Sequence, residues 1–133
     1  MNNITINPTE ILQAARSILL IDWPNIDVPG ILVRQGFTVY CYSPDKYTTA
    51  EISPKEDHLI FRGLDVAPDQ VDIVNIYRPE QEHAAILAKH VLPLGGKVVW
   101  LQPPIVSRKT RSLAADYGLA FVEGISISEV VRR

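Results

Sequence analysis

The stretch Ser17-Ile-Leu-Leu-Ile-Asp22, followed by the turn Trp23-Pro24-Asn25, sets the pattern of this chain. A near-continuous aliphatic run of this kind is typical of a strand buried on both faces of a parallel sheet. Three further runs also end at polar turns with proline: residues 38–42 before Ser43-Pro44, residues 71–77 before Arg78-Pro79, and residues 97–101 before Gln102-Pro103-Pro104. If these strands are parallel, all four turns lie at one rim, where open α/β sheets bind their ligands.

Helical signals fill the intervals between the runs. Residues 27–35 have apolar positions at helical spacing after Asp27, a favourable cap, and Gly36 is expected to end that helix in a left-handed conformation. The spacing predicts further helices over 79–91 and 107–117, a last strand over 119–122 and a short helix from Ser126 or Ser128. In the helix over 79–91, the inward-facing residues are expected to be Ala84, Leu87, Ala88 and Val91.

The order of these elements predicts an α/β fold with a Rossmann-like, mostly parallel sheet between two helical layers, a three-layer α/β/α sandwich. We expect one domain over residues 1–133, with a helical extension in residues 1–16 that begins at the cap Asn7. Residues 43–70 are the least regular part, with Pro44 and Pro54 among many charges. Within them, residues 51–52 and 58–62 are expected to pair as a small hairpin, with one arm as an edge strand.

Composition excludes several classes of function. Apolar residues make up 47% of the chain and charged residues 21%, as in ordinary globular domains, and the net charge of −2 offers no basic excess for nucleic acid or acidic lipid. No apolar stretch approaches the roughly 20 residues of a membrane helix. Cys41 is the only cysteine, so no disulfide forms within one chain, and we expect it in the core. The cytoplasm is the expected location, since the N-terminus lacks a signal-peptide pattern.

Catalytic motifs are not found. The chain has no nucleophile elbow, Walker loop or G-x-G-x-x-G, and its three histidines are not spaced for a metal site. These observations favour a non-catalytic protein without a metal. An enzyme that uses Asp22 as a base would need a second titratable group at the rim, and this reading ranks last.

Three segments, taken in order, resemble the small stand-alone CoA-binding domain proteins. These segments are residues 18–29, residues 71–80 (Val-Asp-Ile-Val-Asn-Ile-Tyr-Arg-Pro-Glu) and residues 98–102 (Val-Val-Trp-Leu-Gln). Such proteins share a Rossmann-like fold with the CoA-binding domain of the succinate–CoA ligase alpha subunit. The resemblance spans about residues 17–122 and indicates a divergent branch, because the turn after Asp22 has no glycine and Gln102 is followed by two prolines.

The resemblance implies a nucleotide-binding module whose ligand is CoA or an acyl-CoA. Its adenosine part would lie over the ends of the first two strands, with Trp23 available to stack on the adenine. Arg78 and the helix that begins at Pro79 would face the phosphates, and Gln102 would close the far side. The candidate binding residues are Asp22, Trp23, Pro24, Asn25, Ser43, Pro44, Lys46, Tyr77, Arg78, Pro79 and Gln102.

A second interpretation remains open, in which the fold has lost its ligand and serves as a protein-interaction or dimerisation unit. Prolines in the rim turns favour it, because they stiffen the loops and remove amide donors. Under this reading, Trp23 is a lid on the core and Arg78 forms a salt bridge to Glu80 or Glu82. The partner is then a second copy of the chain or another protein, whereas the nucleotide-binding module would sense or carry its ligand, alone or for a partner enzyme.

Overall fold

Parallel pairing of the four apolar runs builds the centre of the sheet. The computed structural model describes residues 7–44 and 47–132. The runs form β1 (Ser17–Ile21), β2 (Thr38–Ser43), β5 (Ile73–Ile76) and β6 (Val98–Leu101), and a fifth parallel strand is β7 (Ala120–Val122). The order across the seven-stranded sheet is β4-β3-β2-β1-β5-β6-β7. Because Ile21 is level with both Tyr42 and Ile76, and Ile76 with Leu101, the carboxyl ends form one edge.

A long hairpin extends the sheet beyond β2. Strand β3 (Tyr47–Lys55) is antiparallel to β2 and to β4 (His58–Gly63), and Glu56 and Asp57 form a two-residue turn between them. The predicted hairpin therefore exists, but the prediction made it much too short. Pro54 lies in the segment expected to be least regular, and the strand tolerates it because it lies beyond the last β2–β3 pair, Val39 with Ile52, where β3 has a partner on one side only.

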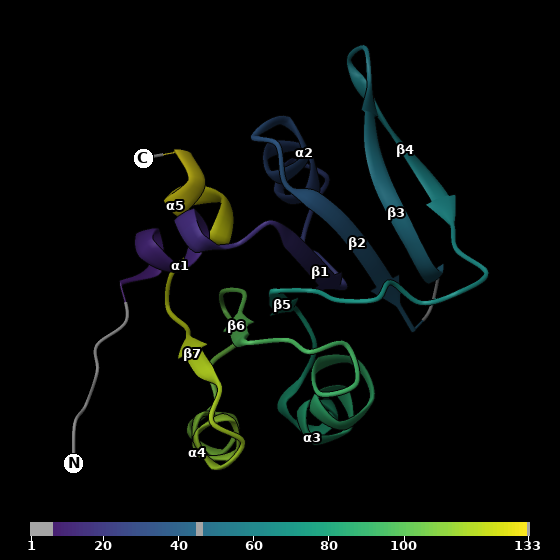
Figure 1. Cartoon of the computed structure of the whole chain (residues 1–133). Helices are drawn as coiled ribbons and strands as arrows, with labels where there is room; N and C mark the ends of the chain where they lie inside the picture. The colour runs from purple at the N-terminus through teal and green to yellow at the C-terminus, as the bar shows by residue number, and fades with distance from the viewer. Residues whose placement is uncertain (1–6, 45–46, 133) are drawn as a thin grey trace.

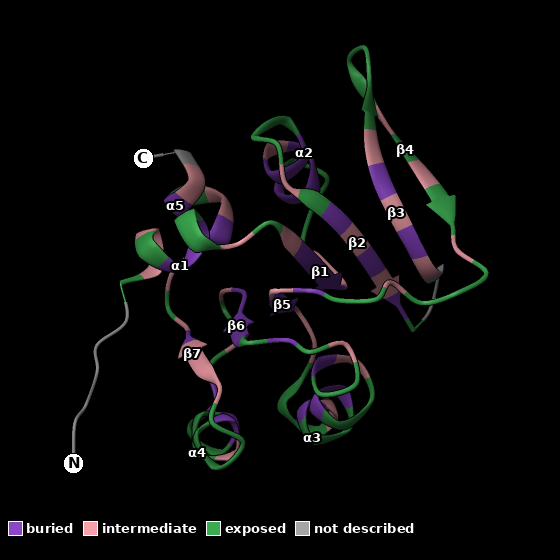
Figure 2. Ribbon diagram, in the orientation of Figure 1, coloured by how far each residue is buried: buried purple, intermediate pink, exposed green. Residues whose placement is uncertain are grey.

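Helices cover both faces of the sheet, as predicted (Figure 1). On one face lie α1 (Pro8–Ala14), α2 (Asp27–Arg34) and α5 (Ile127–Arg132). On the other lie η1 (Glu80–Glu82), α3 (His83–Ile86), η2 (Leu87–Val91) and α4 (Arg108–Asp116). Each layer closes its own apolar core, and Figure 2 shows the buried residues concentrated on the central strands, while much of the hairpin is exposed.

Side-chain caps mark the starts of α1 and α4. The Asn7 side chain accepts a hydrogen bond from the Thr9 amide at 2.8 Å, and the Ser107 side chain caps α4 through the Thr110 amide at 3.0 Å. The expected cap at Asp27 is wrong, since Asp27 is the first helical residue and its amide donates to the Asn25 side chain at 3.0 Å. The Asx turn at Asn25 therefore starts this helix.

The segment after β5 is not one regular helix. It passes from a 3₁₀ turn in η1 through α3 into a π-helical turn in η2. These turns rotate the chain by different angles per residue, so the predicted inward positions Ala84 and Ala88 are exposed, and His83 and Ile86 are buried instead. Leu87 and Val91 face the core as expected. Within the described part of the chain, no helix has the length and apolarity to cross a membrane.

The Cys41 thiol is predicted to be unreactive while the protein is folded. It is fully buried on β2, and burial raises its pKa to about 12, so about one thiol in ten thousand is ionised at pH 8. Titration with a thiol-specific disulfide reagent at pH 8 should show no rapid reaction in buffer and one reactive thiol per chain after unfolding in guanidinium. Rapid labelling of the folded protein would contradict this burial.

Candidate functional site

The tips of the four parallel strands are joined by backbone hydrogen bonds. The amide of Asp22 donates to the Tyr42 carbonyl at 2.8 Å, that of Tyr77 to Ile21 at 3.0 Å, and that of Gln102 to Ile76 at 2.9 Å. The turns that begin at these residues therefore lie side by side at one rim of the sheet.

The rim has a reversal point between β1 and β5. After β1 the chain passes through α2 to β2 and then to the hairpin, all on one side of β1. It returns to place β5, β6 and β7 on the other side. The crevice at such a reversal is the usual ligand site of open α/β sheets. Asp22 lies on the β1 side of this crevice, and Arg78 lies on its β5 side.

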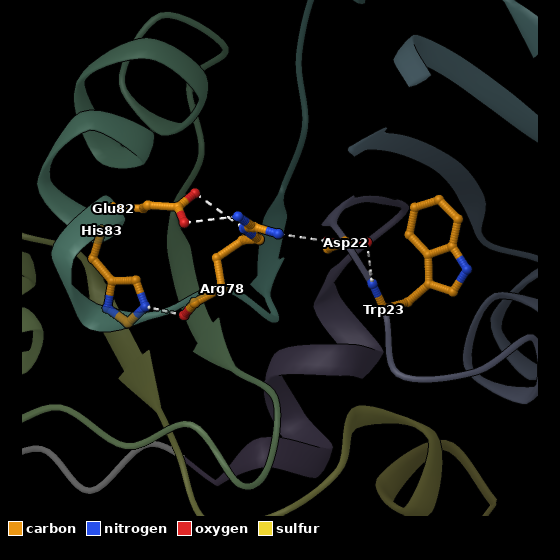
Figure 3. Close-up of polar contacts among 5 residues, drawn as sticks. All are labelled: Asp22, Trp23, Arg78, Glu82 and His83. Atoms are coloured by element: carbon orange, nitrogen blue, oxygen red, sulfur yellow. Dashed lines mark hydrogen bonds and ion pairs between the residues drawn. The ribbon is translucent and has the colours of Figure 1, made fainter. Parts of the chain in front are cut away.

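An ion-pair cluster spans this crevice (Figure 3). Asp22 has a positive φ of 62°, which turns the chain at the tip of β1. Its carboxylate accepts a hydrogen bond from Arg78 Nη1 at 3.0 Å. On the other side, Arg78 holds Glu82 with two bonds, from Nε at 3.0 Å and from Nη2 at 2.8 Å. Arg78 is thus held by two hydrogen bonds to Glu82, on its own side of the crevice, and by one hydrogen bond to Asp22, on the opposite side.

The electrostatics of the cluster favour a permanently charged Arg78. The hydrogen bonds to Glu82 raise the pKa of its guanidinium above the ordinary value; burial lowers it, and the bond to Asp22 adds to the rise. Two carboxylates surround one cation, so the cluster carries an excess negative charge. A ligand anion must therefore compete with a carboxylate, and Asp22, with one bond, is the easier of the two to replace.

His83 holds the loop that carries Arg78. Its Nε2 lies 2.8 Å from the Arg78 carbonyl oxygen, and its Nδ1 lies 2.7 Å from Thr110 Oγ1 on α4. Because a carbonyl only accepts, Nε2 carries the proton. The ring is almost fully buried. From the sequence, His83 was weighed only as a metal ligand, and its structural role was not predicted.

Trp23 lies beside the cluster but packs into the molecule. Its ring stacks on Phe61 of β4, with centroids 5.9 Å apart and planes 21° apart, and it contacts the α2-side core. In the view of Figure 3 the indole lies on the side of Asp22 away from Arg78. This placement matches a lid over the core. Pro24 and Asn25 are exposed in the turn, where Asn25 starts α2.

Gln102 has its side chain inside the molecule. Its Oε1 accepts from Asn75 Nδ2 at 3.2 Å and from the Ile127 amide at 3.3 Å, while its Nε2 donates to Ser126 Oγ at 2.7 Å. Asn75 Oδ1 is the one buried side-chain N or O atom in the described residues without a hydrogen-bond partner. Asn75 was missed in the sequence, although a polar residue within the apolar run 71–77 is a visible signal.

The other candidates lie around the same edge. Ser43 is buried at the end of β2 and Pro44 is exposed after it; Tyr77 is partly buried, and Pro79 is exposed before η1. Lys46 lies outside the described residues. The structure thus brings Asp22 and Arg78 into contact and turns Trp23 and Gln102 towards the interior. No group of three or more acidic, histidine or cysteine side chains within the described ranges is arranged to hold a metal.

Comparisons with known proteins give one matching family model and several structures of the same fold. A family model described as CoA binding domain matches residues 21–128. A Thermus thermophilus protein called cell-free ID.343 is 20% identical, with 96% of this chain and 98% of that chain covered and a TM-score of 0.73. A hypothetical protein from Pyrococcus horikoshii OT3 is 19% identical, with coverage of 100% and 96% and a TM-score of 0.68. At these identities the structural matches establish the fold alone.

The bond between Asp22 and Arg78 should contribute measurably to stability. In a double-mutant cycle of Asp22→Asn and Arg78→Met, urea unfolding is expected to give a coupling energy of about 1 kcal/mol, because both side chains are mostly buried, at 25% and 21% exposure. The matched control is the cycle of Glu51→Gln and Arg62→Met, whose ion pair at 2.6 Å is more exposed and should couple by less than about 0.5 kcal/mol. Equal coupling in the two cycles would contradict this ranking.

Proposed function

The chain belongs to the CoA-binding domain family, and we propose that it binds CoA or an acyl-CoA, without catalysing a reaction, at the rim of its sheet between β1 and β5. The observation that carries this proposal is the position of Arg78. A guanidinium with a fixed fork of donors stands at the strand-order reversal of a Rossmann-like sheet, where phosphate groups of nucleotides commonly bind.

In the proposed complex a phosphate oxygen takes the place of the Asp22 carboxylate on Arg78. The bidentate bond to Glu82 keeps the guanidinium in position during this exchange. The adenosine end extends over the tips of β1 and β2, near Trp23, Asn25, Ser43 and Pro44, and Lys46 stays a candidate from the sequence alone. Tyr77 and Pro79 flank the phosphates. The buried side chain of Gln102 lies beneath the side of the crevice that β5 and β6 form.

The side chains around the crevice support binding better than catalysis. Asp22 and Glu82 are both bonded to Arg78, and both ring nitrogens of His83 are hydrogen bonded. A general base must take up the substrate proton, and carboxylates paired with an arginine or a buried imidazole bonded at both nitrogens are poorly placed to do so. These groups are therefore suited to hold and position a ligand, and we infer a role in sensing or carrying it, alone or for a partner enzyme.

A second candidate function rests on the same cluster. Because Asp22, Arg78 and Glu82 satisfy one another, the rim is stable without any ligand. The rigid proline-bearing turns then form a preorganised surface for a second copy of the chain or for another protein. Failure of all CoA ligands to bind would favour this interpretation.

The CoA proposal predicts opposite effects of two substitutions at the crevice. In calorimetric titrations with CoA, Arg78→Met is expected to weaken binding at least tenfold, since a charge-assisted phosphate contact is lost. Asp22→Asn is expected to strengthen binding several-fold, because the phosphate no longer competes with a carboxylate for Arg78. Pantetheine, which lacks the phosphates, should respond to neither change.

Arg62→Met provides the control, because Arg62 lies on the exposed edge strand β4 and pairs with Glu51 rather than with a rim residue. The affinity of the Arg62→Met variant for CoA should equal that of the wild-type protein. The absence of heat and of any thermal shift with millimolar CoA or acetyl-CoA, in the wild type and in Asp22→Asn alike, would refute the proposed function.

A further inference from the structure

The outer edge of β4 is an open edge of the sheet. β4 stands last in the order of the described strands, and Figure 1 shows it as the outermost strand of the hairpin. Its sequence over residues 58–63, His-Leu-Ile-Phe-Arg-Gly, contains neither proline nor lysine. Its register with β3 is unbroken from the pair Lys55–His58 to the pair Ala50–Gly63. A regular edge strand of this kind presents backbone donors and acceptors with which a further strand can pair.

The opposite edge of the sheet carries the features that prevent such pairing. β7 has 3 residues, whereas β4 has 6. The guanidinium of Arg111 on α4 lies 5.7 Å from the centre of the Phe121 ring on β7, and it forms an ion pair with Glu123 just beyond that strand. A very short edge strand beside charged side chains is a poor template for a further strand. The middle of β4, residues 59–61, has neither feature.

Pro54 shows which backbone groups of β4 point outward. It lies opposite Leu59, and because proline has no N–H, this pair cannot exchange two backbone hydrogen bonds. One step beyond the end of β4, the Leu64 amide donates to the Thr49 carbonyl at 2.9 Å. Bonded and non-bonded pairs alternate along antiparallel strands, so residues 58, 60, 62 and 64 bond towards β3. The N–H and C=O groups of Leu59 and Phe61 therefore point to the outer edge.

We propose that β4 pairs in antiparallel direction with β4 of a second copy of this chain, about a two-fold axis at Ile60. Leu59 then exchanges both backbone hydrogen bonds with Phe61 of the second copy, and Phe61 does the same with Leu59 of that copy. An axis perpendicular to the sheet keeps the α2 layers of both copies on one face. β2 and β3 separate this edge from β1 and the crevice, so the association is a property distinct from the proposed ligand binding.

Apolar side chains meet on both faces of the sheet in this register. Ile60 is 41% exposed and comes directly opposite Ile60 of the second copy. On the α2 face, the half-buried Leu59 comes against the half-buried Phe61 of the second copy. Ile26 of α2, which is 54% exposed, lies beside these residues and extends the apolar surface. Apolar residues directly opposite one another stabilise antiparallel pairing, so the dimer buries surface that the single chain leaves open.

The charged residues at the ends of β4 tolerate this pairing. His58 comes opposite Arg62 of the second copy, and each brings a carboxylate of its own chain. Asp57 lies 3.4 Å from His58, and Glu51 lies 2.6 Å from Arg62. The positive charges that face each other are therefore offset. A second copy matches this edge at every position, in side-chain type and in backbone direction, which is why it is the occupant proposed over a strand of an unrelated protein.

Sedimentation equilibrium of the purified chain, without ligand, tests the association. An edge of 6 residues is small against the roughly 20–30 residues a side of a standard interface, so we expect a reversible dimer with a Kd on the order of 10 μM. Ile60→Lys should weaken it at least tenfold, because like charges then lie directly opposite each other across the axis. Val66→Lys is the matched control, since Val66 is 78% exposed in the loop after β4.

Three outcomes of this experiment would overturn the proposal. The first is a wild-type chain that remains monomeric up to about 1 mM, far above the expected Kd. The second is a dimer that Ile60→Lys leaves unchanged, which would place the interface elsewhere on the molecule. The third is equal weakening by Ile60→Lys and Val66→Lys, which would show a general effect of added charge.

Cross-linking tests the register itself. Cα atoms of a non-bonded antiparallel pair lie about 4.5 Å apart, within the range that a disulfide spans, so Ile60→Cys should form a covalent dimer on mild oxidation. In His58→Cys, on the same strand and face, the two thiols would lie about 13 Å apart and should not link. Cys41 is buried and does not interfere. Equal cross-linking of both variants, or of neither, would contradict the proposed pairing.

Discussion

The level parallel pairing of β2, β1, β5 and β6 is the constraint on which the rest of the structure depends. It places Ile21 beside Tyr42 and Ile76, and it puts all the following turns at one edge. The helices then fall on two faces, because each crossover must return over the sheet. A slip of one residue would turn every apolar side chain of a strand to the opposite face. Strand pairing in the core therefore determines the position of the rim turns, and no additional interaction is needed to bring the rim residues together.

In the proposed complex, the contact between Asp22 and Arg78 decides how strongly an anion can bind at this rim. Many proteins present an open cation to phosphates, but here the cation is held by two carboxylates before any ligand arrives. Under the proposed function, binding is an exchange of one anion for another on Arg78, and its strength depends on the difference between the two interactions. Arg78 makes one hydrogen bond to Asp22 and two to Glu82, so the proposal makes Asp22 the carboxylate that is exchanged. His83 holds the loop of Arg78 through a hydrogen bond to the Arg78 carbonyl.

Much of this fold could be predicted from the sequence, because buried parallel strands and capped helices have strong local signals. The runs beginning at Ser17 and at Lys97 are such strands, and Asn7 and Ser107 cap helices as expected. The hairpin was underestimated because Pro54 hides the length of β3, which only its pairing with β2 and, around Pro54, with β4 reveals. Convergence at the rim was predictable from topology. The choice of Glu82 over Glu80, the inward turn of Gln102 and the role of His83 depend on side-chain packing between distant segments, which no local pattern contains.

The most direct test of this account is a crystal structure of the protein with CoA. The account predicts a phosphate oxygen within hydrogen-bond distance of Arg78, with Asp22 turned away and the two bonds to Glu82 intact. The ligand would then lie over the tips of β1, β2 and β5. CoA bound elsewhere on the molecule, with the bond between Asp22 and Arg78 unbroken, would contradict the account.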